Sequence, residues 1–503
     1  MDNFPHRSPR QGMLTAVGEA TTGLPRRTGT HHDDGYGGLF MHAAASTETD
    51  TGIDTGDTTD TGFDTSAVIS TDSPGSSVEA ETESEAEVHR EAGAGLPRAP
   101  LLKPALRRGW RDLNTVQFGM TPAHALTLGP MDTATGSFLD LLNGTRGPEL
   151  LREEGRRMDL PDGHVDGLLR RLARAGLLDD ARGGGPGGDW LRRRKAALDR
   201  LRPDLASLSL TTSEPGEAIG RLAARRSARV QVRGAGRVGA VLASLLAAAG
   251  VGEVDVRDIG RVEPWDVTPG GLPAETVGDR RDDAARRIAR RHAPDRPPRR
   301  DTRSPRGQDA HGHSLVIIAP RDDVGVHAPS PSAAEPLIDS GTPHLYVGVV
   351  EGTGMVGPLV LPGETACAGC LDADRTDRDP VWPRLVTQWR SGRGRARPVP
   401  PCDVALATTV AGLAAAHALA FLDGRIPSTA GARWEVSLPG LTWHARPVWA
   451  HRACPCGAAD KGEEEHPSAD EGSHETMAEE RPSKKPRREA DTARPARIWR
   501  AHV

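Results

Sequence analysis

The chain has 503 residues, a length that suits two or three domains. Hydrophobic residues make up 36% and aromatic residues 3%, beside 58 Gly and 41 Pro, which excludes a chain that folds over its whole length. The net charge of -5 excludes a strong general attraction to nucleic acid or membranes, and five cysteines do not form a secreted disulfide framework. No signal peptide is predicted, so we expect a cytoplasmic protein.

Both ends of the chain are polar. Residues 1–96 contain few apolar side chains and include an acidic tract rich in Thr, Asp and Gly. Such a segment cannot bury enough apolar surface to offset its chain entropy, so we expect it to be disordered. Residues 461–503 contain the basic run SKKPRR, and we expect a second disordered tail there rather than a nucleic-acid or import signal.

Residues 97–182 have the pattern of a small folded unit. Short alternating apolar runs between 110 and 128 predict a β-meander, and three apolar helical faces follow it. The third helix has apolar residues at i, i+3, i+4 and i+7, namely Val165, Leu168, Leu169 and Leu172. Three strands and three helices predict a winged-helix-like α+β domain. The glycine-rich run at 183–188 and the basic helix after it predict a linker over 183–205.

The next unit, 206–460, opens on a glycine fingerprint. A short strand with Val230 and Val232 precedes Gly234, Gly236 and Gly239, which form G-x-G-x-x-G before a helix expected from about 238 to 249. These glycines allow a tight turn and close approach of the backbone to a phosphate at the helix N-terminus. A second strand then ends at Asp258, 19 positions after the last glycine, where an acceptor for ribose hydroxyls belongs. The pattern predicts a Rossmann-like α/β domain that binds a nucleotide.

Further strands of this domain are expected at 315–318, 345–350, 356–361 and 434–437, with mobile loops at 294–312 and 390–401. The apolar segment 404–422 is long enough to raise the question of a membrane span. It is rich in alanine and follows an Asp403 that suits an N-cap, which favours a helix buried against the sheet.

Four cysteines form two pairs, Cys367 with Cys370 and Cys454 with Cys456. Two thiolate pairs separated by a long insertion suit one tetrahedral zinc ion in a closed structural site, and zinc is favoured over disulfides in the cytoplasm. The fifth, Cys402, lies at the start of the apolar helix. It has two interpretations: a nucleophile whose pKa the helix N-terminus lowers, or a small apolar residue that fills space.

Together these features resemble the superfamily of ThiF and ubiquitin-activating enzymes. The resemblance rests on the glycine turn, Asp258, the run GMVGPLVLPGETACAGC at 354–370 and CPCG at 454–457. It implies a ThiF-type fold with structural zinc, a site for ATP with magnesium, and a dimer. A nicotinamide oxidoreductase is the less favoured alternative, because it rests on the glycine turn alone.

The unit at 97–182 resembles the leader-peptide recognition element of peptide-modifying enzymes. Fused to a ThiF-like domain, it resembles the cyclodehydratase-associated proteins of thiazole/oxazole-modified peptide pathways. That resemblance implies that a precursor leader peptide adds as a strand to the small sheet, at about 125–128, and lies against the third helix, at about 165–172. DNA binding is the alternative. Three arginines on the third helix favour it, and three aspartates near that helix oppose it.

The sequence departs from the active enzymes of this superfamily. Their Asn-Leu-x-Arg-Gln-like run is replaced by 265–271, and no lysine occurs between 196 and 460, so the family's catalytic lysine is missing. Arg281 is its nearest replacement, but a planar guanidinium differs from a compact ammonium. Arg321 stands at the place of the magnesium-binding acid, and Asp322 or Asp323 beside it is the alternative ligand.

These departures predict a degenerate adenylation site in a protein that binds a precursor or carrier peptide and presents it to a separate modifying enzyme. The alternative is a working adenylyltransferase that activates a peptide or carrier carboxylate. In it, ATP lies on the glycine turn, Arg281 neutralises phosphate and Cys402 accepts an acyl or sulfur group.

Overall fold

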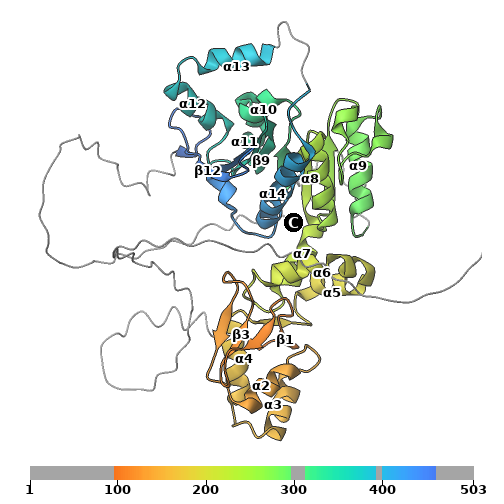
Figure 1. Ribbon diagram of the computed structural model, residues 1–503, viewed down its shortest axis with the longest axis vertical. Coiled ribbons are helices and arrows are strands. Elements are labelled where there is room, and N and C mark those ends of the chain that lie inside the picture. Colours follow the sequence, from red (N-terminus) through yellow and green to blue (C-terminus); the bar gives the residue numbers. More distant parts are fainter. Residues whose placement is uncertain (1–95, 296–311, 392–398, 460–503) are drawn as a thin grey trace, which may run out of the picture. The chain divides into compact units, whose positions relative to one another are not determined.

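The computed structural model describes residues 96–295, 312–391 and 399–459 (Figure 1). The two expected disordered tails and most of the two expected mobile loops lie outside these residues. The described chain contains a small α+β unit, three helices that follow it, and a large α/β domain.

The small unit consists of a three-stranded antiparallel meander, a two-stranded ribbon and three helices. The meander has the order β2-β3-β4, and the ribbon pairs β1 with β5. The elements are β1 (Pro100–Leu102), β2 (Arg108–Trp110), β3 (Val116–Phe118), β4 (Leu126–Leu128), α2 (Thr133–Phe138), η1 (Leu139–Leu141), α3 (Pro148–Arg157), α4 (His164–Arg174) and β5 (Leu178–Asp180). The meander and the three helices confirm the expectation for this segment, and the winged-helix comparison stays a prediction.

The glycine-rich run 183–188, expected to be a flexible joint, contains the start of a helix, and the helix expected after it is present. α5 (Gly185–Arg193), α6 (Lys195–Ser209) and α7 (Glu217–Ala224) pack together around Leu191, Leu201 and Leu222. Pro186 at the first turn of α5 suits a helix start, where its missing N–H costs nothing. The prediction of a flexible joint was wrong because the apolar residues after the glycines have a core to bury in.

The α/β domain is built on a seven-stranded sheet of order β12-β11-β10-β9-β8-β6-β7. Strands β7, β6, β8 and β9 are parallel, and β10, β11 and β12 continue the sheet antiparallel. Its strands are β6 (Arg229–Arg233), β7 (Glu253–Arg257), β8 (Leu315–Ile318), β9 (His344–Val350), β10 (Thr353–Val360), β11 (Ala432–Ser437) and β12 (Trp443–Pro447). The sheet therefore confirms the α/β class and the six strands expected in this domain.

Helices cover both faces of this sheet (Figure 1). On one face α8 (Arg237–Ala248), α9 (Arg281–His292) and α14 (Val404–Leu422) enclose the main core, and on the other α11 (Pro331–Asp339) and α12 (Ala368–Arg378) enclose a smaller one. Strand β9 serves both faces, because Leu345 and Val347 join the main core while Tyr346 joins the smaller. The remaining elements are η2 (Arg225–Ser227), η3 (Pro264–Asp266), η4 (Ala274–Thr276), α10 (Asp323–His327), α13 (Trp382–Ser391) and η5 (Ser428–Ala430).

Among the described residues, α14 is the one helix whose length and apolar composition would allow it to cross a membrane. It packs against α8, β9 and β10, with Val410, Ala411 and Ala414 fully buried. Asp403 caps it by accepting the Leu406 N–H at 3.0 Å. The expected buried helix is confirmed.

Candidate functional site

The glycine turn joins β6 to α8. Gly234 has a φ of +109°, and a Cβ there would lie 1.9 Å from the Ala319 carbonyl oxygen. A Cβ on Gly239 would lie 2.0 Å from the Gly234 carbonyl oxygen, so this residue lets α8 pack closely on the strand. A Cβ on Gly236 would lie 2.7 Å from Cγ of Arg321. The backbone thus requires two of these glycines, while the third faces an arginine side chain.

Asp258, the expected ribose acceptor, is occupied within the protein. Its side chain is 8% exposed and follows β7 directly. One carboxylate oxygen accepts the Ala235 N–H at 2.9 Å, and the other accepts the Gly260 N–H and Arg281 Nε, each at 2.9 Å. Three donors fill most of the about four acceptor positions of a carboxylate. The residue shapes the turn, and it can accept a ribose hydroxyl fully only if Arg281 moves.

Arg281 begins α9 and lies between two carboxylates. Besides Asp258, its guanidinium contacts Asp266 Oδ2 at 3.1 Å, and the two side chains of this pair are 7% and 3% exposed. Asp266 also pairs with Arg321, whose Nε lies 2.9 Å from Oδ1. Arg321 further pairs with Glu263. We call Asp258, Glu263, Asp266, Arg281 and Arg321 the acid–arginine network.

The network keeps Arg321 charged and pairs each of its acids with an arginine. Burial lowers the pKa of Arg321, but hydrogen bonds and ion pairs with Glu263 and Asp266 outweigh burial and hold that pKa above its usual value. Each of the network's three carboxylates contacts a guanidinium. None of these acids is therefore available to a metal ion unless an arginine leaves it.

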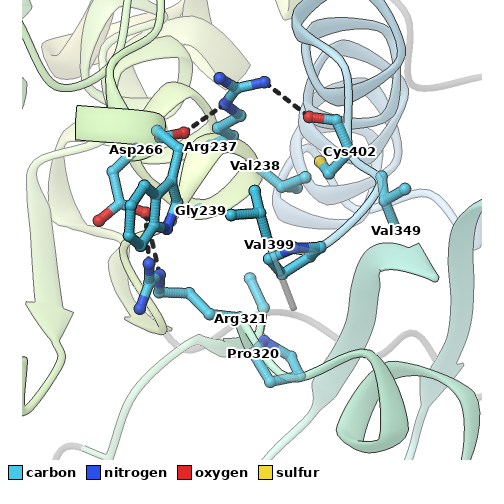
Figure 2. A pocket seen from close by; sticks show the side chains of 13 residues that line it. Arg237, Val238, Gly239, Asp266, Pro320, Arg321, Val349, Val399 and Cys402 are labelled. Atoms are coloured by element: carbon cyan, nitrogen blue, oxygen red, sulfur yellow. Dashed lines mark hydrogen bonds and ion pairs between the residues drawn. The ribbon is translucent and has the colours of Figure 1, made fainter. Parts of the chain in front are cut away.

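A cavity of about 90 Å³ opens beside the glycine turn (Figure 2). Its lining includes Arg237, Trp265, Asp266, Arg321 and Cys402. The guanidinium of Arg237 joins two parts of the lining, donating to the Trp265 carbonyl at 2.5 Å and the Cys402 carbonyl at 2.7 Å (Figure 2). Pockets for small ligands usually measure about 300 Å³ or more, so this cavity is small for a nucleotide.

The two residues expected to be catalytic, Arg281 and Cys402, differ in their relation to the cavity. Arg281 lies outside the lining of this cavity, and Arg321 takes the lining position instead. Cys402 lies one residue before the N-cap of α14, and burial raises the pKa of its thiol to about 11. A raised pKa opposes a thiolate nucleophile and favours the interpretation of Cys402 as an apolar residue that fills space. Asp322 is the N-cap of α10.

Three residues of the site were missed from the sequence: Arg237, Glu263 and Asp266. Their partners are distant in the chain, since Asp266 pairs with a residue 15 positions away and Arg237 with one 165 positions away. Such pairings leave no local pattern. The one available signal was that Arg321 stands where an acid was expected, which implies an acid elsewhere to balance it.

The four paired cysteines come together as expected. Their sulfur atoms all lie within 4.8 Å of one another, with Cys367 Sγ at 3.6 Å from Cys454 Sγ and Cys370 Sγ at 3.5 Å from Cys456 Sγ. Tetrahedral zinc with bonds of about 2.3 Å places its sulfur ligands roughly 3.8 Å apart. The cluster can therefore hold a metal ion such as zinc. His451 contacts Asp377 at 2.9 Å and is outside the cluster.

A second candidate site is the free edge of β4 in the small unit. On either side of β3, Thr115 and Gly119 form backbone hydrogen bonds with the β2 side of the meander. Because backbone groups alternate in direction along a strand, the N–H and C=O of Gln117 also point toward β2, and those of Val116 and Phe118 point toward β4. Leu126 and Leu128 then bond to β3, because they stand opposite Phe118 and Val116. The N–H and C=O of Thr127 point away from the meander, where a further strand can add.

The expected contact surface on α4 needs a correction. Val165, Leu168, Leu169 and Leu172 are buried in the core of the small unit, so a peptide cannot contact them. Gly167, where a Cβ would meet nothing within 4 Å, offers open space on the helix. Nε of Arg171 is buried and has no hydrogen-bond partner within the residues that the structure describes. The accessible part of α4 is thus polar rather than apolar.

Comparisons with known proteins agree on the α/β domain. The model of the ThiF family matches residues 214–458. The crystal structure of E. coli MccB with AMPCPP and MccA has a TM-score of 0.52 and 13% identity, covering 72% of this chain and 99% of that chain. E. coli MccB with ATP gives a TM-score of 0.51 and 13% identity, covering 71% and 99%.

The structure of the heterocyclase TruD has a TM-score of 0.46 and 20% identity, covering 73% of this chain and 44% of that one. No curated protein sequence matches the chain. With identities this low, the MccB structures show a shared fold.

Proposed function

Residues 214–458 of this chain belong to the ThiF family, and from that premise we propose that the protein binds the leader of a precursor peptide and presents the peptide to a separate modifying enzyme. The observation that carries this proposal is the acid–arginine network beside the glycine turn. Its arginines hold Asp258, the expected ribose acceptor, and Asp266, a carboxylate of the cavity lining. The 90 Å³ cavity and the lack of lysine between 196 and 460 point the same way.

The energetic argument is that adenylation depends on groups that neutralise charge as it develops on the phosphates. Removing one such preorganised group costs about 3 kcal/mol of transition-state stabilisation. The catalytic lysine is missing and the magnesium-binding acid is replaced by Arg321. Two losses of this size lower the rate by about four orders of magnitude, which supports a recognition role.

A peptide ligand is supported by the β4 edge and by a structural relative. The outward N–H and C=O of Thr127 offer the backbone pairing that strand addition needs. A structure of the microcin C7 biosynthetic enzyme MccB is known in complex with N-formylated MccA. For this chain we propose that the leader pairs with β4 and that Gly167 and Arg171 on α4 contact its side chains.

We expect Thr127→Pro to weaken leader binding at least about tenfold, because proline removes the one outward N–H in the middle of β4. Proline with its ring nitrogen facing solvent is tolerated on edge strands, so the fold should survive. Arg108→Pro is the matched control, because the backbone N–H of Arg108 also points outward, on β2 at the opposite edge of the same meander. This variant should bind the leader like wild type. Fluorescence anisotropy with labelled candidate precursor peptides measures both. Equal binding by wild type and Thr127→Pro contradicts strand addition at β4.

The second candidate function is ATP-dependent adenylation of a peptide or carrier carboxylate. Arg237 and Arg321 line the cavity at the N-terminus of α8, where they can neutralise phosphate. In this function ATP with magnesium lies on Gly234–Gly239, the ribose contacts Asp258, Arg281 supplies positive charge and Cys402 accepts the activated group. Asp258 becomes fully available only after Arg281 leaves it.

Arg321→Ala separates the two functions. If Arg321 blocks a degenerate site, wild type does not bind Mg·ATP at micromolar concentration, and the variant gains affinity because Gly236 is uncovered. If Arg321 serves catalysis, wild type binds Mg·ATP and the variant binds it at least about tenfold more weakly. Isothermal titration calorimetry distinguishes these outcomes, with Arg291→Ala on the exposed face of α9 as the charge-matched control.

Three further proposals complete this assignment. We propose that the four clustered cysteines hold structural zinc that fastens the end of the described chain to α12. We propose a homodimer and a cytoplasmic location on the family resemblance. The separate modifying enzyme is the partner that supplies the ATP-dependent chemistry, and co-purification with this chain is the direct test.

A further inference from the structure

Helix α4 carries three arginines outside the core of the small unit. Arg170 and Arg174 are exposed and Arg171 is half-buried, while the apolar residues of the helix face the core. No ion pair within the described residues involves any of these three guanidinium groups. The helix therefore holds positive charge that the small unit itself does not neutralise.

The one acidic residue of α4, Asp166, is already paired. Both of its carboxylate oxygens accept from Nε of Arg152 on α3, at 3.0 and 3.1 Å. Because each residue turns an α-helix by about 100°, Arg171 lies about 140° around the helix from Asp166, on the flank away from α3. Asp166 thus leaves the charge of Arg171 unbalanced.

Arg171 differs from its two neighbours because part of its guanidinium group is enclosed. Nε is buried and has no hydrogen-bond partner in the part of the chain that the structure describes. A buried donor without an acceptor loses the hydrogen bonds that it made to water in the unfolded chain, and a ligand that supplies an acceptor restores them. Arg170 and Arg174 are exposed and keep their hydration.

Gly167 leaves room for a ligand beside Arg171. It stands four residues before Arg171, on the same side of the helix, and a Cβ there would meet nothing within 4 Å. Nε–H and the adjacent Nη–H of an arginine lie in one plane and can bind both oxygens of a carboxylate at once. Arg171 is thus suited to a carboxylate side chain that reaches over Gly167.

A carboxylate fits this helix better than the phosphates of a nucleic acid. A nucleic-acid backbone is bound by several exposed cations without opposing charge, whereas the exposed Asp159 and Asp162 precede the same helix. A buried Nε also suits one inserted side chain rather than a phosphate backbone that lies on the protein surface.

We propose that Arg171 selects the leader by binding one of its acidic side chains, Asp or Glu. This inference rests on the leader recognition proposed above and deepens it, because it assigns the chemistry that the leader must carry. Strand addition at β4 uses backbone groups that every peptide offers, so a side-chain contact is needed to distinguish one peptide from another. The carboxylate that pairs with Arg171 provides that contact.

The test selects binders of the full chain from a library of random linear peptides and measures the selected peptides by fluorescence anisotropy. We expect wild type to enrich an Asp or Glu at one preferred position, and its change to Asn or Gln to weaken binding at least about tenfold. Arg171→Gln should bind the acidic and the amide peptide equally. Arg170→Gln, which removes the same charge from the adjacent exposed position, should keep the wild-type preference within about twofold.

Each measurement compares two peptides on one variant, so partial unfolding lowers both affinities and leaves their ratio unchanged. Arg171→Lys keeps the charge without the planar fork and should retain part of the preference, which a merely structural role of Arg171 would not explain.

Failure of this inference and failure of leader recognition give different results. Selected peptides without a preferred acid, or an undiminished preference in Arg171→Gln, overturn the role of Arg171 and leave strand addition in place. No selected peptide, or selected peptides that bind Thr127→Pro like wild type, overturn leader recognition at β4 and this inference with it. Duplex DNA that displaces the selected peptides and binds more tightly than they do overturns a peptide as the ligand of α4.

Discussion

Asp258 illustrates how one side chain can serve the protein rather than a ligand. It holds Ala235 and Gly260 in the turn and pairs with the buried guanidinium of Arg281. Replacing it by alanine leaves that guanidinium with fewer partners, at a cost of about 3 kcal/mol or more. Loss of nucleotide binding in such a variant would therefore mix unfolding with recognition. This is why Arg321, at the edge of the network, is the better position to test.

At the metal cluster, Gly369 should be intolerant of a methyl group. A Cβ there would lie 2.9 Å from Cys454 Sγ and 3.5 Å from Cys367 Sγ, so a sulfur must move. We expect Gly369→Ala to release zinc at least about tenfold faster than wild type, because the ligand geometry is disturbed. A colorimetric zinc chelator measures the release. Gly412→Ala, far along the chain in α14 and with nothing within 4 Å, is the control.

The sequence identified residues of the site more reliably than their roles. The glycines and the clustered cysteines were recognisable because their spacing is local and their chemistry is specific. The partners of Arg281 and Arg321 were not, because ion pairing between distant residues depends on how strands and loops are placed. Whether Arg281 and Cys402 take part in catalysis stays a prediction. The position of Arg281 and the raised pKa of Cys402 do not favour it.

At the scale of elements, the contact of α14 with β10 depends on small residues. A Cβ on Gly354 would lie 2.4 Å from Val410 Cγ2, so we expect Gly354→Ala to destabilise the domain by about 1–3 kcal/mol through overpacking. Gly412→Ala places the same methyl group in open space on the exposed side of α14. It should stabilise by about 0.5–1 kcal/mol, since glycine is a poor helix former. Urea denaturation measures both, and equal effects of the two would contradict this packing.

The sequence predicted best those strands whose residues are nearly all buried. The run at 315–318 is buried on both faces and was recognised with its observed bounds. Strand β12 was missed because four of its five residues are exposed and its composition is polar. Helix α5 was missed as the start of a packed bundle because glycines dominate its first turn. In both cases tertiary contacts decided a structure that local propensity did not favour.

At the scale of the whole α/β domain, one buried ion pair joins segments 198 residues apart. Arg225, before β6, contacts Asp423 at the end of α14 through both carboxylate oxygens, at 2.8 and 2.7 Å. We expect Asp423→Ala to destabilise the domain by about 3 kcal/mol, because it leaves a buried guanidinium with the Ala249 carbonyl at 3.1 Å and the carboxylate of Asp204 at 3.8 Å. Asp189→Ala breaks an exposed pair with Arg192 and should cost less than about 1 kcal/mol. Thermal unfolding of the two variants provides the comparison.

The short distances within the cysteine cluster also make it sensitive to oxidation. The sulfur atoms of Cys370 and Cys456, and those of Cys367 and Cys454, are separated by less than 4 Å. A bound metal ion occupies all four thiolates, but once the metal leaves, each thiol has a neighbour with which a disulfide can form after a small movement. Metal lost in air would then be lost irreversibly, whereas a reductant would keep the site able to reload. At the proposed metal site, resistance to oxidation therefore depends on whether the metal ion stays bound.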